Sequence, residues 1–433
     1  MYRVDSKVRR LVAVGAAAAL ALSMAACSGS GTGGSSGTKT VVWSSWGTPE
    51  EIARYKAFDT QFMKDHPDIK MVFQPVADYD DYHTKLLAEL ASGTAPDAFY
   101  IGDDKIGQFV NSDALMPLTD LMNSSASKTK PADFAQGLFG ATKKGKEIYA
   151  APNDSNPDAL WYDKVALKKA GVTDDPATLA AAGKWTTEAY LDMNTKLKKA
   201  GLTGSMFWNY WSTHYSWISA QGGKSFDSNG KFVANSDPKA VAAVDVLAKN
   251  FQNGTFVVAD TLPQGAGADS VFVTHKAGFF IQGRYTIGTV KAAGDPDNYD
   301  VVQWPTPDGK AAPTGVAVSY LAINAKTKNK DATFEFWTSF LSAEGQTVRL
   351  QGGGNAVPSI KGADKVVLDG YPAHAKTLLE MRDIGFEDYV TEASVAGLSS
   401  DVSAKMLALY QGKESTKSTL DDIGALISKK TGK

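Results

Sequence analysis

The chain has 433 residues, more than a single hydrophobic core usually spans, so at least two core-bearing units are expected. Its 43% hydrophobic and 21% charged residues exclude a disordered chain. The formal net charge of -2 excludes the strongly basic surface of a nucleic-acid-binding protein, so we expect no nucleic-acid partner.

The first 26 residues have the three parts of an export signal. A basic stretch through Arg10 precedes an apolar run, 11–22, that is shorter than the roughly 20 residues of a transmembrane helix. Small residues then lead to Cys27, the only cysteine. Residues 24–27 resemble the lipobox of bacterial lipoproteins, although Met24 departs from the usual Leu. We expect 1–26 to be a signal peptide and Cys27 to carry a lipid anchor; the alternative is a free thiol in a cleaved peptide.

A Gly/Ser-rich stretch follows the anchor. Residues 28–38 are almost entirely Gly, Ser and Thr, a composition that behaves as a flexible coil, so 27–39 is expected to be a tether. An anchored protein of this kind suits the outer face of the cytoplasmic membrane in a Gram-positive cell. With no second cysteine, intramolecular disulfides are excluded and stability must come from packing.

Strands and helices alternate after the tether. Thr48, Pro49 and Glu51 form a capping box that predicts the start of a helix, and His66-Pro67 ends it. The expected elements of this region are strands at 40–43, 69–73 and 98–101, with a helix after each of the first two.

The same alternation recurs in a second region, about 159–302. Helices are expected there near 187–199, 238–251 and 285–291. A later strand at 316–323 precedes a helix at about 331–341, and the C-terminus is expected to be helical, with Val402, Met406, Leu409 and Tyr410 on one face. This order predicts an α/β protein with mainly parallel sheets and helices on their faces. Three irregular stretches are candidate crossovers between lobes: 151–156, 311–315 and 352–358.

Several segments, in order, resemble one family. They are Val41-Val42-Trp43 with a Trp46 loop, Gly93-Thr94-Ala95-Pro96-Asp97 before a strand, Ala159-Leu160-Trp161-Tyr162-Asp163-Lys164, Gly278 to Tyr285, Leu321-Ala322-Ile323-Asn324 leading into Phe334-Glu335-Phe336-Trp337, and Gly352 to Pro358. Together they are similar to the extracellular solute-binding proteins of carbohydrate ABC transporters, the group that includes maltose-binding protein.

The resemblance implies a two-lobe, hinge-linked α/β fold with the ligand in the interlobe cleft. It implies residues 40–150 plus 314–355 for lobe 1, and 153–310 plus 358–433 for lobe 2. The implied function is to bind a small carbohydrate, an oligosaccharide, outside the cell and to deliver it to an ABC importer permease. A monomer without enzymatic activity is expected, held at the membrane through Cys27.

Aromatic side chains are the first candidates for ligand contact, because a sugar ring presents an apolar C–H face to a flat aromatic surface. Trp208 and Trp211 lie in a stretch dense in aromatics, and Trp46 lies in an expected loop with small and polar neighbours. The alternative for Trp208 and Trp211 is a place in the core, on one face of a helix. Trp43, inside a strand, is expected to pack in the core.

Carboxylates and amides are the second group of candidates, since they hydrogen-bond vicinal hydroxyls in fixed directions. Position selects the residues: the end of a strand, a crossover, or a turn with close backbone approach. The expected binding residues are Asp103 and Asp104 after the third strand, Asn153 and Asp154 in the first crossover, Gly283, Arg284 and Tyr285 in one turn, and Asn355 after three glycines.

Two other functions remain open. An extracellular glycoside hydrolase would share the export signal and the aromatic contacts but would need two opposed carboxylates. A solute-binding protein for a peptide, a polyamine or a phosphorylated polyol would keep the fold and change the ligand. None of the five histidines has the spacing of a zinc site, so we expect neither a metal nor a cofactor.

Overall fold

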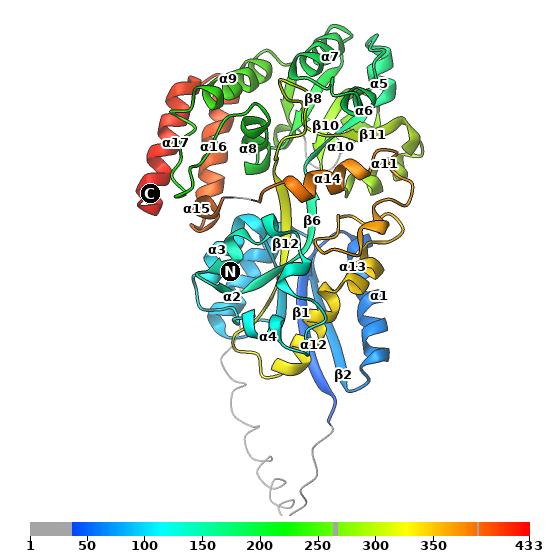
Figure 1. Ribbon diagram of the computed structural model, residues 1–433, viewed down its shortest axis with the longest axis vertical. Coiled ribbons are helices and arrows are strands. Elements are labelled where there is room, and N and C mark those ends of the chain that lie inside the picture. The colour runs from blue at the N-terminus through cyan, green and yellow to red at the C-terminus, as the bar shows by residue number, and fades with distance from the viewer. Residues whose placement is uncertain (1–36, 263–266, 388) are drawn as a thin grey trace, which may run out of the picture. The chain divides into compact units, whose positions relative to one another are not determined.

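The computed structural model describes residues 37–262, 267–387 and 389–433 (Figure 1). The expected signal peptide, Cys27 and nearly all of the expected tether lie outside these residues. Among the described helices, none is long and apolar enough to cross a membrane.

The first sheet has five strands in the order β2-β1-β3-β12-β6. The first three strands are parallel, whereas β12 runs antiparallel to both β3 and β6. The sheet is therefore mixed: β12 alone runs against the other four strands, because it enters the sheet from the opposite direction after the chain has built the second sheet. Its strands are β1 (Lys39–Trp46), β2 (Ile69–Val76), β3 (Ala98–Gly102), β6 (Ala150–Pro157) and β12 (Val316–Ile323).

The second sheet also has five strands, in the order β11-β7-β10-β8-β9. Here β10, β8 and β9 are parallel, and β7 is antiparallel to β10 and β11. Its strands are β7 (Ala159–Asp163), β8 (Thr203–Phe207), β9 (Phe256–Val258), β10 (Ala277–Gln282) and β11 (Tyr299–Val302). A separate two-stranded hairpin pairs β4 (Lys143–Lys144) with β5 (Glu147–Ile148).

Helices pack against both sheets. Those against the first sheet are α1 (Pro49–Asp65), α2 (Tyr79–Ser92), α3 (Asp103–Val110) and α12 (Lys330–Leu341), with α13 (Ala343–Leu350) beside α1 and α12 and the short α4 (Thr119–Asn123) near the hairpin. Those of the second sheet are α5 (Lys164–Lys169), α6 (Pro176–Ala181), α7 (Thr187–Lys199), α9 (Pro238–Gln252), α10 (Gly267–Val273) and α11 (Thr286–Ala293). The others are α8 (Trp211–Ala220), α14 (Lys376–Ile384), α15 (Val390–Ala393), α16 (Leu398–Tyr410) and α17 (Thr416–Thr431).

Local sequence signals determine where the first helix begins. Thr48 accepts a hydrogen bond from the Glu51 backbone, and the Glu51 carboxylate accepts one from the Thr48 backbone, so the expected capping box is confirmed. A cap of this kind stabilises a helix by roughly 0.5–2 kcal/mol. Tyr55, Phe58 and Phe62 on its buried face pack into the core, as their spacing predicts.

Each sheet has a hydrophobic core of its own, which is the two-lobe α/β arrangement expected from the order of elements. Trp43, fully buried, is confirmed as a core residue of the first lobe, where its ring stacks on Phe73 with 4.1 Å between centroids. The C-terminal helices α16 and α17 pack on α9 in the second lobe, while the short α15 packs on α3 in the first. The last 50 residues therefore contact both lobes (Figure 1).

The first expected crossover, 151–156, is a strand and not an irregular stretch. It lies inside β6, an edge strand that extends from one lobe toward the other (Figure 1). Pro152 and Pro157 make the sequence look irregular, because proline is normally excluded from the interior of a sheet. An edge strand such as β6 tolerates both. Asp158 alone separates β6 from β7, so the chain passes between the sheets at this residue.

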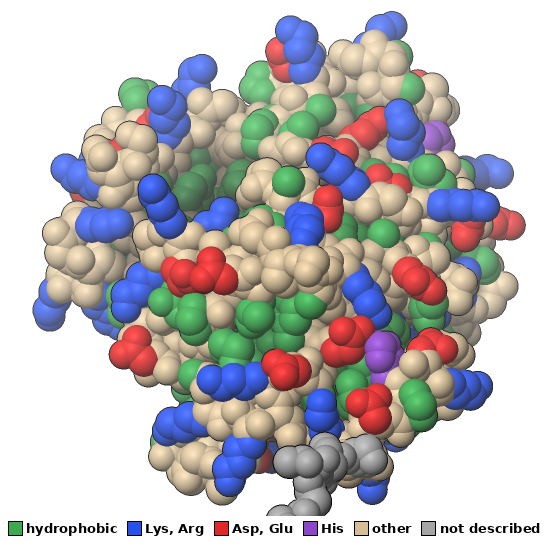
Figure 2. All heavy atoms as spheres, turned by 60° about the horizontal axis from the view of Figure 1, so that its bottom comes forward, with side chains coloured by type: hydrophobic (Ala, Val, Ile, Leu, Met, Phe, Trp, Pro, Cys, Tyr) green, Lys and Arg blue, Asp and Glu red, His purple; other side chains and the backbone are tan. Residues whose placement is uncertain are grey.

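The surface of the face shown in Figure 2 carries basic and acidic side chains interspersed, without a large patch of one sign. This distribution agrees with the near-neutral net charge of the sequence. It gives no electrostatic footprint for nucleic acid on this face.

Candidate functional site

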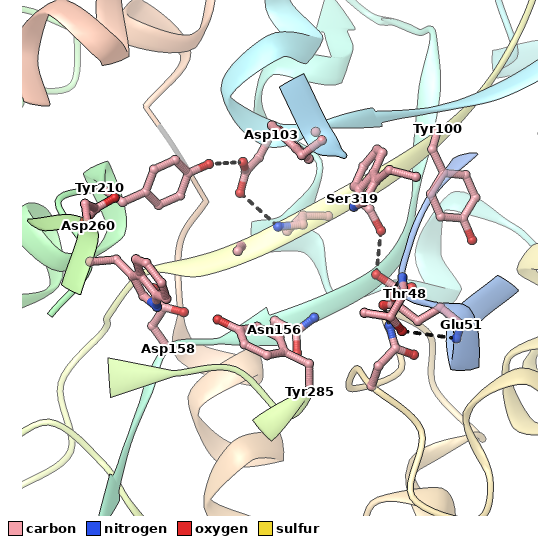
Figure 3. Close-up of a pocket in the computed structure, with 18 of the residues that line it drawn as sticks. Thr48, Glu51, Tyr100, Asp103, Asn156, Asp158, Tyr210, Asp260, Tyr285 and Ser319 are labelled. Carbon is pink, nitrogen blue, oxygen red and sulfur yellow. Dashed lines mark hydrogen bonds between the residues drawn. The ribbon is translucent and has the colours of Figure 1, made fainter. Parts of the chain in front are cut away.

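A cavity of about 680 Å³ lies between the two sheets (Figure 3). Nearly half of its lining residues lie at or just after the carboxyl ends of strands β1, β3, β8, β9 and β10, which is where ligands of open α/β sheets bind. The lining residues are Trp46, Thr48, Glu51, Tyr55, Tyr79, Tyr100, Gly102, Asp103, Asp154, Asn156, Asp158, Trp208, Asn209, Tyr210, Asp260, Tyr285, Ala317, Val318, Ser319 and Asn355.

Trp46 is the last residue of β1, not part of a loop as its neighbours suggest. It is half-buried, and its ring meets Tyr79 and Tyr100 edge-on, at centroid distances of 4.9 and 5.6 Å. These contacts fix the plane of the indole while part of the ring faces the cavity. A fixed, half-exposed indole is the surface on which a pyranose ring stacks.

Trp208 and Trp211 are placed differently although only three residues separate them. Trp208 follows β8, lines the cavity, and donates its indole N–H to the Gln282 side chain at 3.1 Å. Trp211 is the first residue of α8, is 1% exposed, and lies in the core of the second lobe. The structure therefore brings Trp208 to the cavity and leaves Trp211 behind it.

Asp103 and Tyr210 join the two lobes across the cavity. The Tyr210 hydroxyl donates to Asp103 Oδ1 at 2.7 Å, and the Val318 backbone N–H donates to Asp103 Oδ2 at 3.0 Å (Figure 3). Burial raises the pKa of Asp103 to about 7, and the neighbouring Asp104 carboxylate adds to the shift. Asp103 is thus a carboxyl group that titrates near neutral pH at the wall of the cavity.

Asp104 is turned away from the cavity lining. Its carboxylate accepts from the Tyr79 hydroxyl at 2.5 Å and pairs with the Lys105 ammonium at 2.7 Å. Both carboxylate oxygens of Asp104, which we expect from the sequence to bind a ligand, therefore interact with Tyr79 and Lys105 instead. Asp104 instead fixes Tyr79, which does line the cavity.

Strand β6 and the residue after it supply a row of polar side chains. Asp154 and Asn156 in β6 and Asp158 directly after it line the cavity, because alternate residues of an extended chain face the same side. A β-bulge opposite Ser319 and Tyr320 leaves Asn153 without a pairing partner in the ladder, fully buried and outside the lining. Bulges of this kind often lie beside binding sites, where they redirect side chains.

One end of the cavity joins the first lobe to the segment after α13. The Asn355 amide donates to the Glu51 carboxylate, and the Ser319 hydroxyl donates to Asp154 Oδ1 at 2.5 Å. Burial raises the pKa of Glu51 and of Asp154, an effect that the guanidinium of Arg349, 3.9 Å from Asp154 Oδ2, opposes at Asp154. We call Glu51, Asp154 and Asn355 the β6–α13 end.

The opposite end surrounds residues 209–212, which comprise the end of the β8–α8 turn and the first two residues of α8. Each of three carboxylates accepts a hydrogen bond from this short segment: Asp260 from the Asn209 N–H at 2.7 Å, Asp103 from Tyr210, and Asp158 from the Ser212 hydroxyl. Burial raises the pKa of Asp158 to about 6. We call Asp103, Asp158 and Asp260 the β8–α8 end. Figure 3 shows the three on one side of the cavity, and Thr48, Glu51 and Ser319 on the other.

Arg284 has a structural place instead of the expected place against a ligand. It is 1% exposed, and its guanidinium donates to the carbonyl oxygens of Gly354, Ala356 and Val366 at 2.6, 2.9 and 2.7 Å. These bonds attach the turn after β10 to the segment that carries Asn355. Arg284 therefore lies behind the cavity wall and outside its lining.

Gly283 and Tyr285 flank this arginine and are placed differently. Tyr285 lines the cavity with 42% of its surface exposed. Gly283 is outside the lining, and a Cβ there would approach the Tyr285 ring to 2.6 Å and the Asn156 side chain to 2.7 Å. The glycine thus permits the close packing that positions Tyr285 and Asn156.

The structure also adds lining residues that the sequence did not suggest. Glu51 has a signal in the sequence, the capping box, but that signal accounts for it as a helix cap. Tyr100 lies within a buried strand, and Ser319 alternates along β12, so neither position stands out before the sheet is assembled. Asp158 lies in a one-residue connection and Asp260 in a three-residue 3-10 helix, and no sequence motif marks either position.

The charge of the lining is one-sided. Five carboxylates face the cavity, and the described lining contains no Lys, Arg or His. No group of three or more metal-ligating side chains is found in the described part of the chain. Aromatic faces together with carboxylate and amide groups can bind a polyhydroxylated, uncharged or cationic molecule, and they would repel an anion.

Comparisons with known proteins agree with this geometry. A family model described as bacterial extracellular solute-binding protein matches residues 46–347. The chain is 25% identical over 315 residues to the maltotriose-binding protein of Pyrococcus abyssi, covering 69% of this chain and 61% of that protein. It is 28% identical over 214 residues to the arabinooligosaccharide-binding protein of Bacillus subtilis, covering 47% and 46%. The matched segments thus span from about half to about three-fifths of the length of these curated relatives.

The fold has a close counterpart among solved structures. An ABC substrate-binding protein from Listeria monocytogenes in complex with cycloalternan superposes with a TM-score of 0.79 at 19% identity, covering 91% of this chain and 99% of that one. At this identity the similarity shows the fold. It supports the two-lobe arrangement expected from the sequence.

Proposed function

This chain belongs to the bacterial extracellular solute-binding proteins, and from this premise we propose that it binds a small carbohydrate, an oligosaccharide, in the cavity between its lobes. The loaded protein would then deliver the sugar to the permease of an ABC importer. The relatives named above as maltotriose-binding and arabinooligosaccharide-binding support this ligand class.

The observation that carries the proposal is the placement of two indoles on opposite lobes. Trp46 ends β1 in the first lobe and Trp208 follows β8 in the second, and both line one cavity. Each presents an apolar face for a sugar ring, and the carboxylates and amides between them can accept and donate to ring hydroxyls. A volume of about 680 Å³ lies within the usual range of roughly 300–1,000 Å³ for small-molecule sites.

We propose a binding set restricted to the side chains that line the cavity. Of the residues that the sequence predicts, it keeps Trp46, Asp103, Asp154, Trp208, Tyr285 and Asn355. It adds Glu51, Asn156, Asp158, Tyr210 and Asp260. Arg284 and Asp104 act indirectly, by holding lining residues in place.

Lobe boundaries, location and mode of action belong to the same proposal. The expected lobes, 40–150 plus 314–355 and 153–310 plus 358–433, need one change: we propose 40–157 plus 314–355 and 159–310 plus 358–433, because β6 pairs within the first sheet, with closure about the crossovers. We retain a monomer held at the outer face of a Gram-positive membrane by lipid on Cys27. Replacing Cys27 by Ala should move the protein from the membrane fraction into the medium; retention at the membrane would contradict the anchor.

A carrier is favoured over a hydrolase and over an anion-binding protein. The relatives are named as binding proteins, which supports transport over hydrolysis. A phosphorylated polyol would bring negative charge to a lining with five carboxylates and no basic side chain among the described residues. We therefore propose that phosphorylated ligands do not bind.

A thermal-shift panel of mono- and oligosaccharides tests the proposal. A ligand that binds only the folded protein stabilises it by RT ln(1 + [L]/Kd), about 2.7 kcal/mol at a hundredfold excess over Kd. We expect at least one neutral saccharide to raise the Tm, and glycerol phosphates to have no effect. The shift should be lost in Trp46→Ala and Trp208→Ala but kept in the control Leu87→Ala, which removes an exposed apolar side chain of α2 outside the lining. An unchanged shift in both tryptophan variants would contradict the proposed site.

A further inference from the structure

The carboxylates at the two ends of the cavity differ in whether a cation faces them. At the β6–α13 end, the buried Arg349 lies 3.9 Å from Asp154. At the β8–α8 end, none of Asp103, Asp158 and Asp260 forms an ion pair within the described chain. Their hydrogen-bond donors are neutral: a phenol, a hydroxyl and backbone N–H groups.

In a folded protein, a buried acidic group normally has a cationic side chain beside it, and this group has none among the described residues. A buried charge is usually paired, because removing a carboxylate from water without a counter-charge is costly. Asp103 is 4% exposed and Asp158 is half-buried, so water does not fully replace the missing cation. The partner must come from outside the chain, or the carboxyl groups must hold protons.

The aromatic rings of Trp208 and Tyr210, beside these carboxylates, also favour a cationic partner. Trp208 and Tyr210 belong to the same turn, and an aromatic face attracts a cation through its quadrupole. At the other side of the cavity, the Tyr100 hydroxyl is buried and has no hydrogen-bond partner among the described residues. A ligand that carries both hydroxyl groups and a positive charge would satisfy both ends.

We propose that the natural ligand is an amine-bearing saccharide, whose protonated nitrogen binds at the β8–α8 end among Asp103, Asp158 and Asp260. This inference rests on the proposed function and narrows its ligand class. The hydroxyl-rich remainder of the ligand occupies the rest of the cavity, toward the β6–α13 end. The site distinguishes an amino sugar from its N-acetyl form because acetylation removes the positive charge and leaves the carboxylates without a counter-ion.

Matched saccharides that differ only at C2 test this inference. One β-1,4 triplet is cellobiose, N,N′-diacetylchitobiose and chitobiose with free amines, and an α-1,4 triplet is maltose with its 2-acetamido and 2-amino analogues. Calorimetric titration near neutral pH and low salt should show the amine binding at least about tenfold more tightly than the other two members of at least one triplet, the size expected for a charge-assisted hydrogen bond. Added salt should reduce that advantage.

The variant Asp260→Asn tests the place of the nitrogen. Asp260 is exposed and Asn retains an oxygen that can accept from the Asn209 N–H, so folding should be unaffected. We expect the affinity for the amine to fall several-fold more than the affinity for the neutral member, so that the preference for the amine shrinks. Asp192→Asn is the control, since it removes the same charge from the exposed face of α7, outside the lining.

The outcomes separate this inference from the proposed function. If neutral saccharides bind as tightly as the amines in both triplets, the inference is overturned and carbohydrate binding stands. If no saccharide of either triplet or of the wider panel binds, both are overturned. If the amine is preferred but Asp260→Asn weakens the amine and the neutral sugar equally, the β8–α8 end is not where the nitrogen binds and the inference fails.

Discussion

The two ends of the cavity are built from similar side chains but are neutralised in different ways. The β6–α13 end has Arg349 behind Asp154, so one of its two carboxylates is paired with a cation within the protein. The β8–α8 end is held by residues 209–212 and has only neutral donors. The comparison indicates that the protein itself supplies a counter-charge at the β6–α13 end, whereas at the β8–α8 end the ligand supplies it.

The largest expected effect is the loss of Arg349. Arg349→Met leaves Asp154 buried without a cation and removes the guanidinium that lies 4.0 Å above the Phe340 ring, so we expect a loss of about 3–5 kcal/mol in the free energy of unfolding. Urea denaturation measures it. Combining the change with Asp154→Asn should recover part of the loss. A loss below about 1 kcal/mol would show that the β6–α13 end does not depend on this pair.

Truncating a tryptophan at the other end should separate binding from stability. Trp211→Ala opens a cavity in the core behind the β8–α8 end and should cost about 3–5 kcal/mol of stability. Trp208→Ala should cost less stability, because the ring is only partly buried, and should abolish saccharide binding. Equal stability losses with binding retained in Trp208→Ala would remove Trp208 from the site.

A smaller effect is expected from the bond that joins the lobes. Tyr210→Phe removes the donor to Asp103 and leaves that buried carboxyl with one bond fewer, so we expect a loss of about 1–3 kcal/mol. Thermal denaturation without ligand measures the change. Asn355→Ala is the parallel change at the β6–α13 end, where it removes the donor to Glu51. If Tyr210→Phe has no effect, the bond does not contribute to the ligand-free structure.

The smallest effect, for each unit of pH, comes from the ionisation of Asp103. Its pKa is about 7 in the folded protein against 3.8 for an ordinary Asp, so the folded state holds more protons than the unfolded state between these values. Stability should therefore fall as pH rises from about 4 to about 7, by at most about 1.4 kcal/mol per pH unit from this group. Asp103→Asn should flatten the profile; a profile that rises over this range and is unchanged by the substitution would contradict the assignment.

The fold could be predicted largely because its signals are local. The capping box of α1, the buried face of Tyr55, Phe58 and Phe62, and the limits of α7 and β12 follow from spacing and caps along the chain. The strand β6 was missed because its proline and polar residues are typical of irregular segments. Only its position at the edge of a sheet, paired with β12, makes such a sequence a strand.

The site was predictable where position along a strand was enough. Trp46 and Asp103 stand at the carboxyl ends of β1 and β3, where a crevice is expected, and both line the cavity. The sequence could not show that Trp208 faces the cavity and Trp211 the core, because their placement depends on the residue at which α8 begins. The structural role of Arg284 could not be predicted, because its partners are backbone carbonyls of residues about 70 or more positions away and leave no pattern in the sequence. Its place in a glycine-containing turn therefore suggested a ligand contact.

The central claim is that a saccharide binds between Trp46 and Trp208, in the cavity shared by the two lobes. A crystal structure of the protein with the saccharide that gives the largest thermal shift tests it most directly. We predict electron density for a sugar ring against one or both indoles, with its polar groups within hydrogen-bond distance of the lining carboxylates. Density for the saccharide outside this cavity, with both indoles uncovered, would contradict the account.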